Sequence, residues 1–181
     1  MIRTPPMPQR LFAGVFFFLA AVVCAAAPMP MLFRSLGIAL SAYLAFAAAG
    51  MPAAYLAALL APPVGLIGGD PDWLVMLPVV VSGNLLAMLG LEFGWRYAAV
   101  LASPTLLVAP AFAAWQLAKR PLFEVELPWG TGEATWVALH FLVAALGVLL
   151  ALYVDRRRAA RAEGGAAAAG RAGAAAAARS R

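Results

Sequence analysis

Three polar side chains, Ser82, Asn84 and Glu92, interrupt the otherwise apolar stretch 79–95. A polar or ionisable group is expensive inside a membrane and by default marks a ligand path, a proton carrier or a helix contact. We therefore take these three residues as the candidate ligand-binding residues. The simpler reading of Asn84 and Glu92 is structural. An amide framed by small residues can hydrogen-bond across a helix contact, and Glu92 precedes Arg96 by four residues, the spacing of an ion pair on one helix face.

Two carboxylates, Asp70 and Asp72, flank a proline directly ahead of the fourth apolar segment, in the stretch GGDPDW. A carboxylate at a helix N-terminus accepts hydrogen bonds from the free N–H groups there and complements the helix dipole. We expect the pair to cap the helix. The alternative is the mouth of a cation site, which would need more ligands than these two.

His140 is the single histidine of the chain, and Cys24 is the single cysteine. These counts exclude a disulfide within the chain and a histidine- or thiolate-rich metal centre. We therefore expect no metal site and no cofactor. The remaining catalytic chemistry is a Ser–His pair, in which Ser82 would be the nucleophile and His140 its base.

Two stretches around this pair, SGNLLAMLG at 82–90 and LHFLVAALG at 139–147, resemble fragments of the pattern of the rhomboid intramembrane proteases. The resemblance implies an intramembrane hydrolase that uses the two residues. The chain departs from the pattern at Val80, two residues before the serine, and at Val143, because the family carries glycine there. It also has no His/Asn pair in its second apolar segment, 35–49. The hydrolase therefore stands as the alternative function.

The composition indicates that the solvent of this chain is lipid. Of its 181 residues, 65% are hydrophobic and 12% are charged, and the mean hydropathy is +0.89. A soluble domain is about 45–50% apolar and about 25% charged. Because a soluble domain of this length could not bury so much apolar surface, we expect a polytopic integral membrane protein of the all-α class.

Breaks at proline, glycine or charge leave six apolar segments, which predict a compact bundle of six transmembrane helices. The segments lie at about 11–27, 35–49, 52–68, 73–91, 97–118 and 134–154. Only GMP at 50–52 separates the second from the third, so five helices with one long kinked element is the alternative. The first segment resembles a signal peptide, but a cut after Ala27 would leave Pro28 at the junction. We therefore expect a retained helix.

All of the net charge lies behind the last segment. Residues 1–154 hold six basic and six acidic groups, whereas residues 155–181 hold seven arginines against Asp155 and Glu163, which gives +5. Such a juxtamembrane cluster fixes topology and contacts anionic lipid headgroups. The tail has no aromatic platform or folded module for RNA, so we expect no nucleic-acid partner. Its Ala/Gly/Arg-rich sequence predicts a disordered segment.

Basic residues near the segment ends predict the orientation. Residues 1–10 and the tail at 155–181 are both basic, which places the two termini in the cytoplasm, with Arg34 and the GGDPD stretch on the opposite side. The five tryptophans, among them Trp73 and Trp136, fall near segment ends, as residues of an interfacial belt do. The expected location is the cytoplasmic (inner) membrane of a bacterium.

Together these features predict a small, non-enzymatic integral membrane protein. We expect a subunit that packs with partner membrane proteins or binds a small molecule within its bundle, in transport or as a scaffold. The ligand-binding candidates are Ser82, Asn84 and Glu92. The alternative is the Ser–His hydrolase described above.

Overall fold

The computed structural model describes residues 7–93, 98, 100–102 and 133–179. These residues contain helices and no strand, and five helical elements are long and apolar enough to cross a membrane. The five are Met7–Ala26, Met31–Ala48, Met51–Gly68, Pro71–Glu92 and Thr135–Gly165. The all-helical class is confirmed, and the apolar helices indicate a membrane protein. The fifth predicted helix, 97–118, lies almost wholly outside the described residues, so the count of six stays a prediction.

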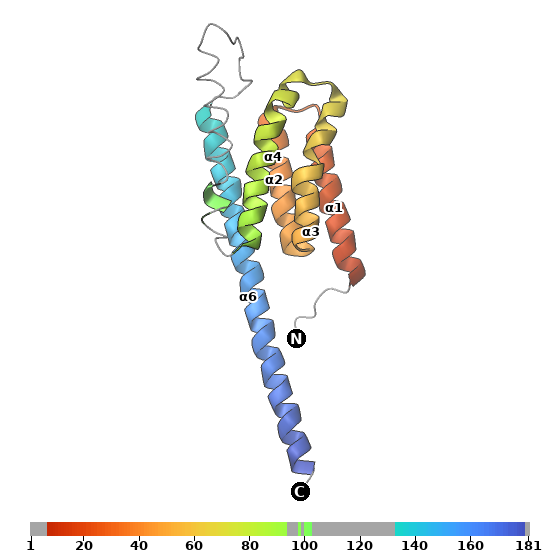
Figure 1. Cartoon of the computed structure of the whole chain (residues 1–181), viewed down its shortest axis with the longest axis vertical. Coiled ribbons are helices and arrows are strands. Elements are labelled where there is room, and N and C mark those ends of the chain that lie inside the picture. The colour runs from red at the N-terminus through yellow and green to blue at the C-terminus, as the bar shows by residue number, and fades with distance from the viewer. Residues whose placement is uncertain (1–6, 94–97, 99, 103–132, 180–181) are drawn as a thin grey trace.

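The first two spans, α1 (Met7–Ala26) and α2 (Met31–Ala48), pack side by side (Figure 1). Two residues, 49 and 50, separate the end of α2 from the start of α3 at Met51, so the second and third spans are separate helices. Gly50 makes the turn between them with a φ of 104°, a conformation that residues with a side chain rarely adopt. GMP is therefore the turn of a hairpin and not a kink in one long helix.

The third span is broken into three pieces, namely α3 (Met51–Tyr55), a π-helical turn η1 (Leu56–Leu60) and a 3₁₀ segment η2 (Pro62–Gly68). Pro62 and Pro63 explain the break, because neither has an N–H group to donate to the carbonyls of the preceding turn. Carbonyls freed in this way inside a membrane need donors from neighbouring helices. Asn84 of α4 supplies one to the carbonyl of Ala58.

The fourth span, α4 (Pro71–Glu92), begins with a proline, which the first helical turn tolerates. The carboxylate of Asp70 accepts hydrogen bonds from the backbone N–H groups of Asp72 and Trp73, at 3.1 and 3.4 Å. The predicted cap is thus confirmed for Asp70. Trp73 differs from the prediction of an interfacial belt, because its side chain is fully buried among the helices.

The last helix, α6 (Glu133–Arg179), packs on α2, and the two run in the same direction (Figure 1). Its buried residues recur every three or four positions, as a helix contact requires. We call them the α6 seam: Trp136, His140, Ala144, Gly147, Ala151 and Val154. A Cβ atom on Gly147 would lie 2.7 Å from the ring of Tyr43, so a glycine is needed for this close approach. Trp136 lies inside the contact and not in a belt.

The tail differs from the predicted disordered segment, because residues 155–179 continue α6 as helix past the end of the bundle (Figure 1). Alanine is the strongest helix former, and a helix that extends an existing span avoids the cost of nucleation. The 47 residues of α6 reach about 70 Å at 1.5 Å per residue.

Candidate functional site

A buried polar network surrounds Arg34, in the first turn of α2. The residue is 5% exposed. Nε and Nη2 donate to the carbonyl oxygen of Ala25 at 2.9 and 2.6 Å, and Nη2 also donates to that of Gly65 at 3.3 Å. Nη1 forms a salt bridge with Oδ2 of Asp70 at 2.5 Å. The guanidinium carbon lies 4.1 Å from the centroid of the Trp73 ring.

This network joins four elements at one end of the bundle. Ala25 lies in the last turn of α1, where carbonyls have no helical donor, and a cation at this end also complements the helix dipole. The indole Nε1 of Trp73 donates to the carbonyl of Pro62 at 2.9 Å, which fastens η2 to α4. A Cβ on Gly65 would lie 2.7 Å from Nη2 of Arg34, so η2 approaches the guanidinium through a glycine. These contacts hold α1, α2, η2 and α4 together at this end of the bundle.

The apolar pattern of the sequence places Arg34 outside the bundle, on the side of the membrane opposite the two termini, and indicates no role for it. The structure instead places it inside α2, with its charge neutralised by Asp70. A signal was present, because the predicted topology put Arg34 and the GGDPD stretch on the same side of the membrane. Opposite charges at one end of a bundle are candidates for a pair.

Asn84 occupies a helix contact. Its Nδ2 donates to the carbonyl oxygen of Ala58 in η1 at 3.3 Å, and the residue is 6% exposed. In an α-helix this carbonyl would accept from residue 62, and in a π-helix from residue 63. Both positions are proline, so neither geometry supplies a donor. The amide of Asn84 replaces the missing backbone hydrogen bond, which is the packing role that the sequence favours for it.

The other two ligand-binding candidates lie elsewhere on α4. The hydroxyl of Ser82 donates to the carbonyl of Val79 in its own helix, at 3.0 Å. Oε2 of Glu92 accepts a hydrogen bond from the hydroxyl of Tyr55 at 2.5 Å, at the exposed end of the helix. The predicted partner of Glu92, Arg96, lies outside the described residues. The three ligand-binding candidates, Ser82, Asn84 and Glu92, therefore each form a hydrogen bond with a different residue.

His140 pairs with a serine other than the predicted one. Its Nε2 lies 2.9 Å from Oγ of Ser35, and its Nδ1 lies 2.8 Å from the carbonyl oxygen of Trp136. A carbonyl only accepts, so Nδ1 carries the hydrogen and the Ser35 hydroxyl donates to Nε2. The rings of His140 and Trp136 stack at a centroid distance of 4.8 Å. Ser82, the predicted nucleophile, bonds to the backbone of α4 instead.

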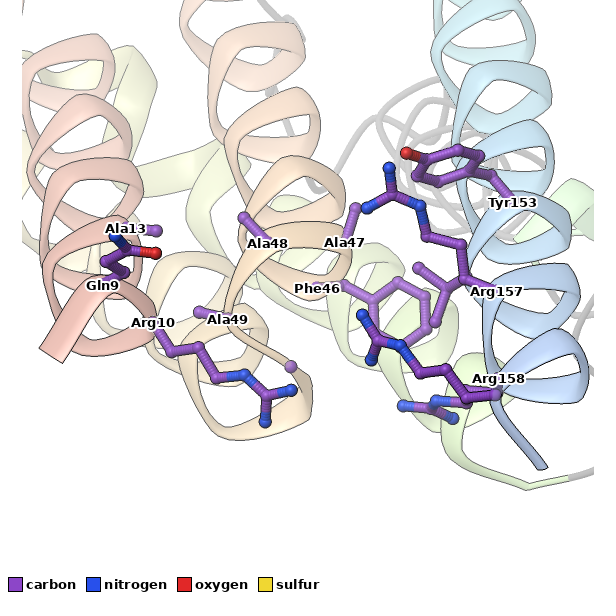
Figure 2. Close-up of a pocket in the computed structure, with 13 residues that line it drawn as sticks. Gln9, Arg10, Ala13, Phe46, Ala47, Ala48, Ala49, Tyr153, Arg157 and Arg158 are labelled. Carbon is purple, nitrogen blue, oxygen red and sulfur yellow. The ribbon is translucent and has the colours of Figure 1, made fainter. Parts of the chain in front are cut away.

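A cavity of about 330 Å³ lies where α1 begins, α2 ends and α6 leaves the bundle (Figure 2). Four arginines line it, and we call it the arginine pocket. Three of them, Arg157, Arg158 and Arg161, come from α6, and Arg10 comes from the first turn of α1. The other lining residues are Gln9, Ala13, Phe46, Ala47, Ala48, Ala49, Gly50, Tyr153 and Val154. The sequence reasoning recognised the charge of the tail but not that α1 and α2 would complete a pocket with it.

Comparison of the chain with protein-family models, with curated proteins and with solved structures gave no match.

Proposed function

We propose that this protein is a non-enzymatic membrane subunit that packs with a partner membrane protein. The observation that carries the proposal is the hydrogen bonding of four of the five buried polar residues among the described part of the chain, namely Arg34, Ser35, Asn84 and His140. Each makes a hydrogen bond to an element other than the helix on which it lies. A ligand site needs convergent polar groups that face a cavity, whereas these groups hold helices together.

Large apolar side chains on two helices supply the surface for a partner. Phe12 and Phe16 of α1 are more than half exposed, and so are Leu142 and Leu149 of α6. In a bilayer these side chains contact either lipid or another membrane protein. The basic residues at both ends of the chain support a topology with both termini in the cytoplasm, in a bacterial inner membrane.

Photo-crosslinking in cells tests the proposal. A benzoylphenylalanine at position 16 or 142 is expected to give a discrete protein adduct with a partner. The same group at Met88, which is buried in the core and does not line the arginine pocket, is the control and is expected to give none. Adducts with lipid alone at all exposed positions would contradict a role as a packing subunit.

A second candidate function is hydrolysis by a Ser–His pair, and the Ser35–His140 contact is the observation that favours it. The tautomer of His140 is correct for a general base, since Nε2 accepts from the hydroxyl. Against it, Ser35 is 2% exposed within the α2–α6 contact, where a substrate has no access. A fluorophosphonate probe should therefore leave the protein unlabelled. Labelling that is lost in Ser35→Ala, but not in Ser82→Ala, would show that the protein is a hydrolase and would contradict the proposed packing subunit.

A further inference from the structure

The arginines of the pocket continue a pattern that begins inside the membrane. The buried residues of the α6 seam recur every three or four positions down to Val154, and Arg157, Arg158 and Arg161 follow at the same spacing. α2 ends at Ala48, so α6 continues past the end of the helix on which it packs. The side chains of Arg157 and Arg158 point toward the last turn of α2, and Arg10 points toward the same pocket from α1 (Figure 2).

The pocket is strongly positive. No carboxylate is among the residues that line it, and the first turn of α1 contains none. Arg157 stacks on the ring of Tyr153, with its guanidinium carbon 4.4 Å from the ring centroid. Among the described residues, Arg10, Arg158 and Arg161 form neither an ion pair nor a hydrogen bond. Unpaired arginines around a cavity are suited to bidentate hydrogen bonds with phosphate oxygens.

Part of the pocket wall is apolar. Ala13, Phe46 and Val154 belong to spans that cross the membrane, and they line the same pocket. The pocket thus lies at the boundary between hydrocarbon and water, where a lipid places its glycerol and phosphate groups. A cavity of about 330 Å³ is large enough for such a headgroup. A soluble phosphate would leave the apolar wall without a partner.

We propose that the arginine pocket binds the phosphate headgroup of an anionic membrane lipid, which ties α6 to the adjoining ends of α1 and α2. This inference is independent of the partner-subunit proposal. The sequence alone predicted a diffuse contact between the tail and anionic lipid. The pocket gives that contact a defined place and a defined set of arginines.

Thermal unfolding of the full-length protein in detergent tests the pocket. Three additions are compared: phosphatidylglycerol, phosphatidylcholine with the same acyl chains, and inorganic phosphate. Only phosphatidylglycerol is expected to raise the melting temperature in a saturable way. The double variant Arg157→Ala/Arg158→Ala is expected to weaken this binding by about fivefold for each arginine removed.

Arg156→Ala is the matched control, because Arg156 is an exposed neighbour that does not line the pocket. This variant should bind phosphatidylglycerol nearly as tightly as the unchanged protein. An equal loss in Arg156→Ala, or an equal shift with phosphatidylcholine, would overturn the pocket as a specific site. An equal shift with inorganic phosphate would assign it to a soluble anion and overturn the lipid. All three arginines are exposed, so unliganded stability should stay unchanged and serves as the check on folding.

Discussion

Asn84 and Ser82 lie two residues apart on α4, but their hydrogen bonds contribute different amounts to the stability of the fold. Asn84 donates to the Ala58 carbonyl of another span, whereas Ser82 donates within its own helix. We predict that Asn84→Leu lowers the free energy of unfolding by about 1–3 kcal/mol, because the carbonyl is left without a donor. Ser82→Ala should cost less than about 0.5 kcal/mol, as expected for a substitution away from such a feature. Titration with sodium dodecyl sulfate, followed by circular dichroism, measures both.

Equal losses in the two variants would contradict this account of Asn84. So would stabilisation of the unchanged protein by a small molecule from the membrane extract that is lost in Asn84→Leu, since that would reveal a ligand-binding role.

Arg34 should not tolerate replacement by another cation. One guanidinium reaches two carbonyls and a carboxylate and also stacks on an indole, whereas an ammonium group cannot make this set of contacts. We predict that Arg34→Lys destabilises the bundle by about 2 kcal/mol. The same change at the exposed Arg156 should leave stability unaltered. Detergent melting curves of the two variants provide the comparison, and matching curves would show that charge alone matters at Arg34.

The sequence was informative about which residues matter and less informative about which residues meet. The apolar pattern identified Asn84 and His140 as rare polar groups inside spans. It could not predict that His140 would contact Ser35, because the packing of α6 against α2 depends on which helix faces meet, and that is a three-dimensional property. Asp70 was predicted as a cap because capping depends only on neighbouring residues.

At the scale of elements, the contact between α2 and α6 depends on a glycine, Gly147, that has no side chain. The Tyr43 ring lies where a Cβ on Gly147 would be. We predict that Gly147→Leu destabilises the protein by about 2–3 kcal/mol, because overpacking at this point pushes the helices apart. Thermal unfolding in detergent measures the loss.

The matched control is Gly164, in the same helix but with nothing within 4 Å of the position that a Cβ would take. Gly164→Ala should be neutral or stabilise α6 by up to about 1 kcal/mol, the difference in helix propensity. If Gly147→Leu were equally harmless, the seam would not be the surface by which α6 is held.

Among the described elements, the sequence predicted the intact spans better than the irregular ones. α2 and α4 begin two to four residues before the predicted segments, since apolar length locates a span but not its caps. The breaks in the third span depend on Pro62 and Pro63, whose effect on the helix the apolar pattern conceals. The helical tail was missed because composition alone does not show that an adjoining span supplies the helix nucleus.

At the scale of the whole molecule, α1 begins and α6 leaves the bundle at the same end, while the Arg34 network lies at the other (Figure 1). We predict that cysteines at positions 68 and 164 are labelled from opposite sides of the membrane. Both positions are exposed glycines with open space around them, and Cys24→Ala provides a background without thiols. A membrane-impermeant maleimide on intact and inverted vesicles makes the measurement, and position 164 is expected on the cytoplasmic side. Labelling of both from one side would contradict the arrangement.

The broken third span has a consequence for how the protein is made. Three of its carbonyls, on Ala58, Pro62 and Gly65, receive hydrogen bonds from Asn84, Trp73 and Arg34 on other spans. A ribosome delivers the third span before the fourth, and during that interval Ala58 and Pro62 lack these donors. Unsatisfied carbonyls cost several kcal/mol each in hydrocarbon. The third and fourth spans should therefore leave the insertion machinery for the bilayer as a pair, not one at a time.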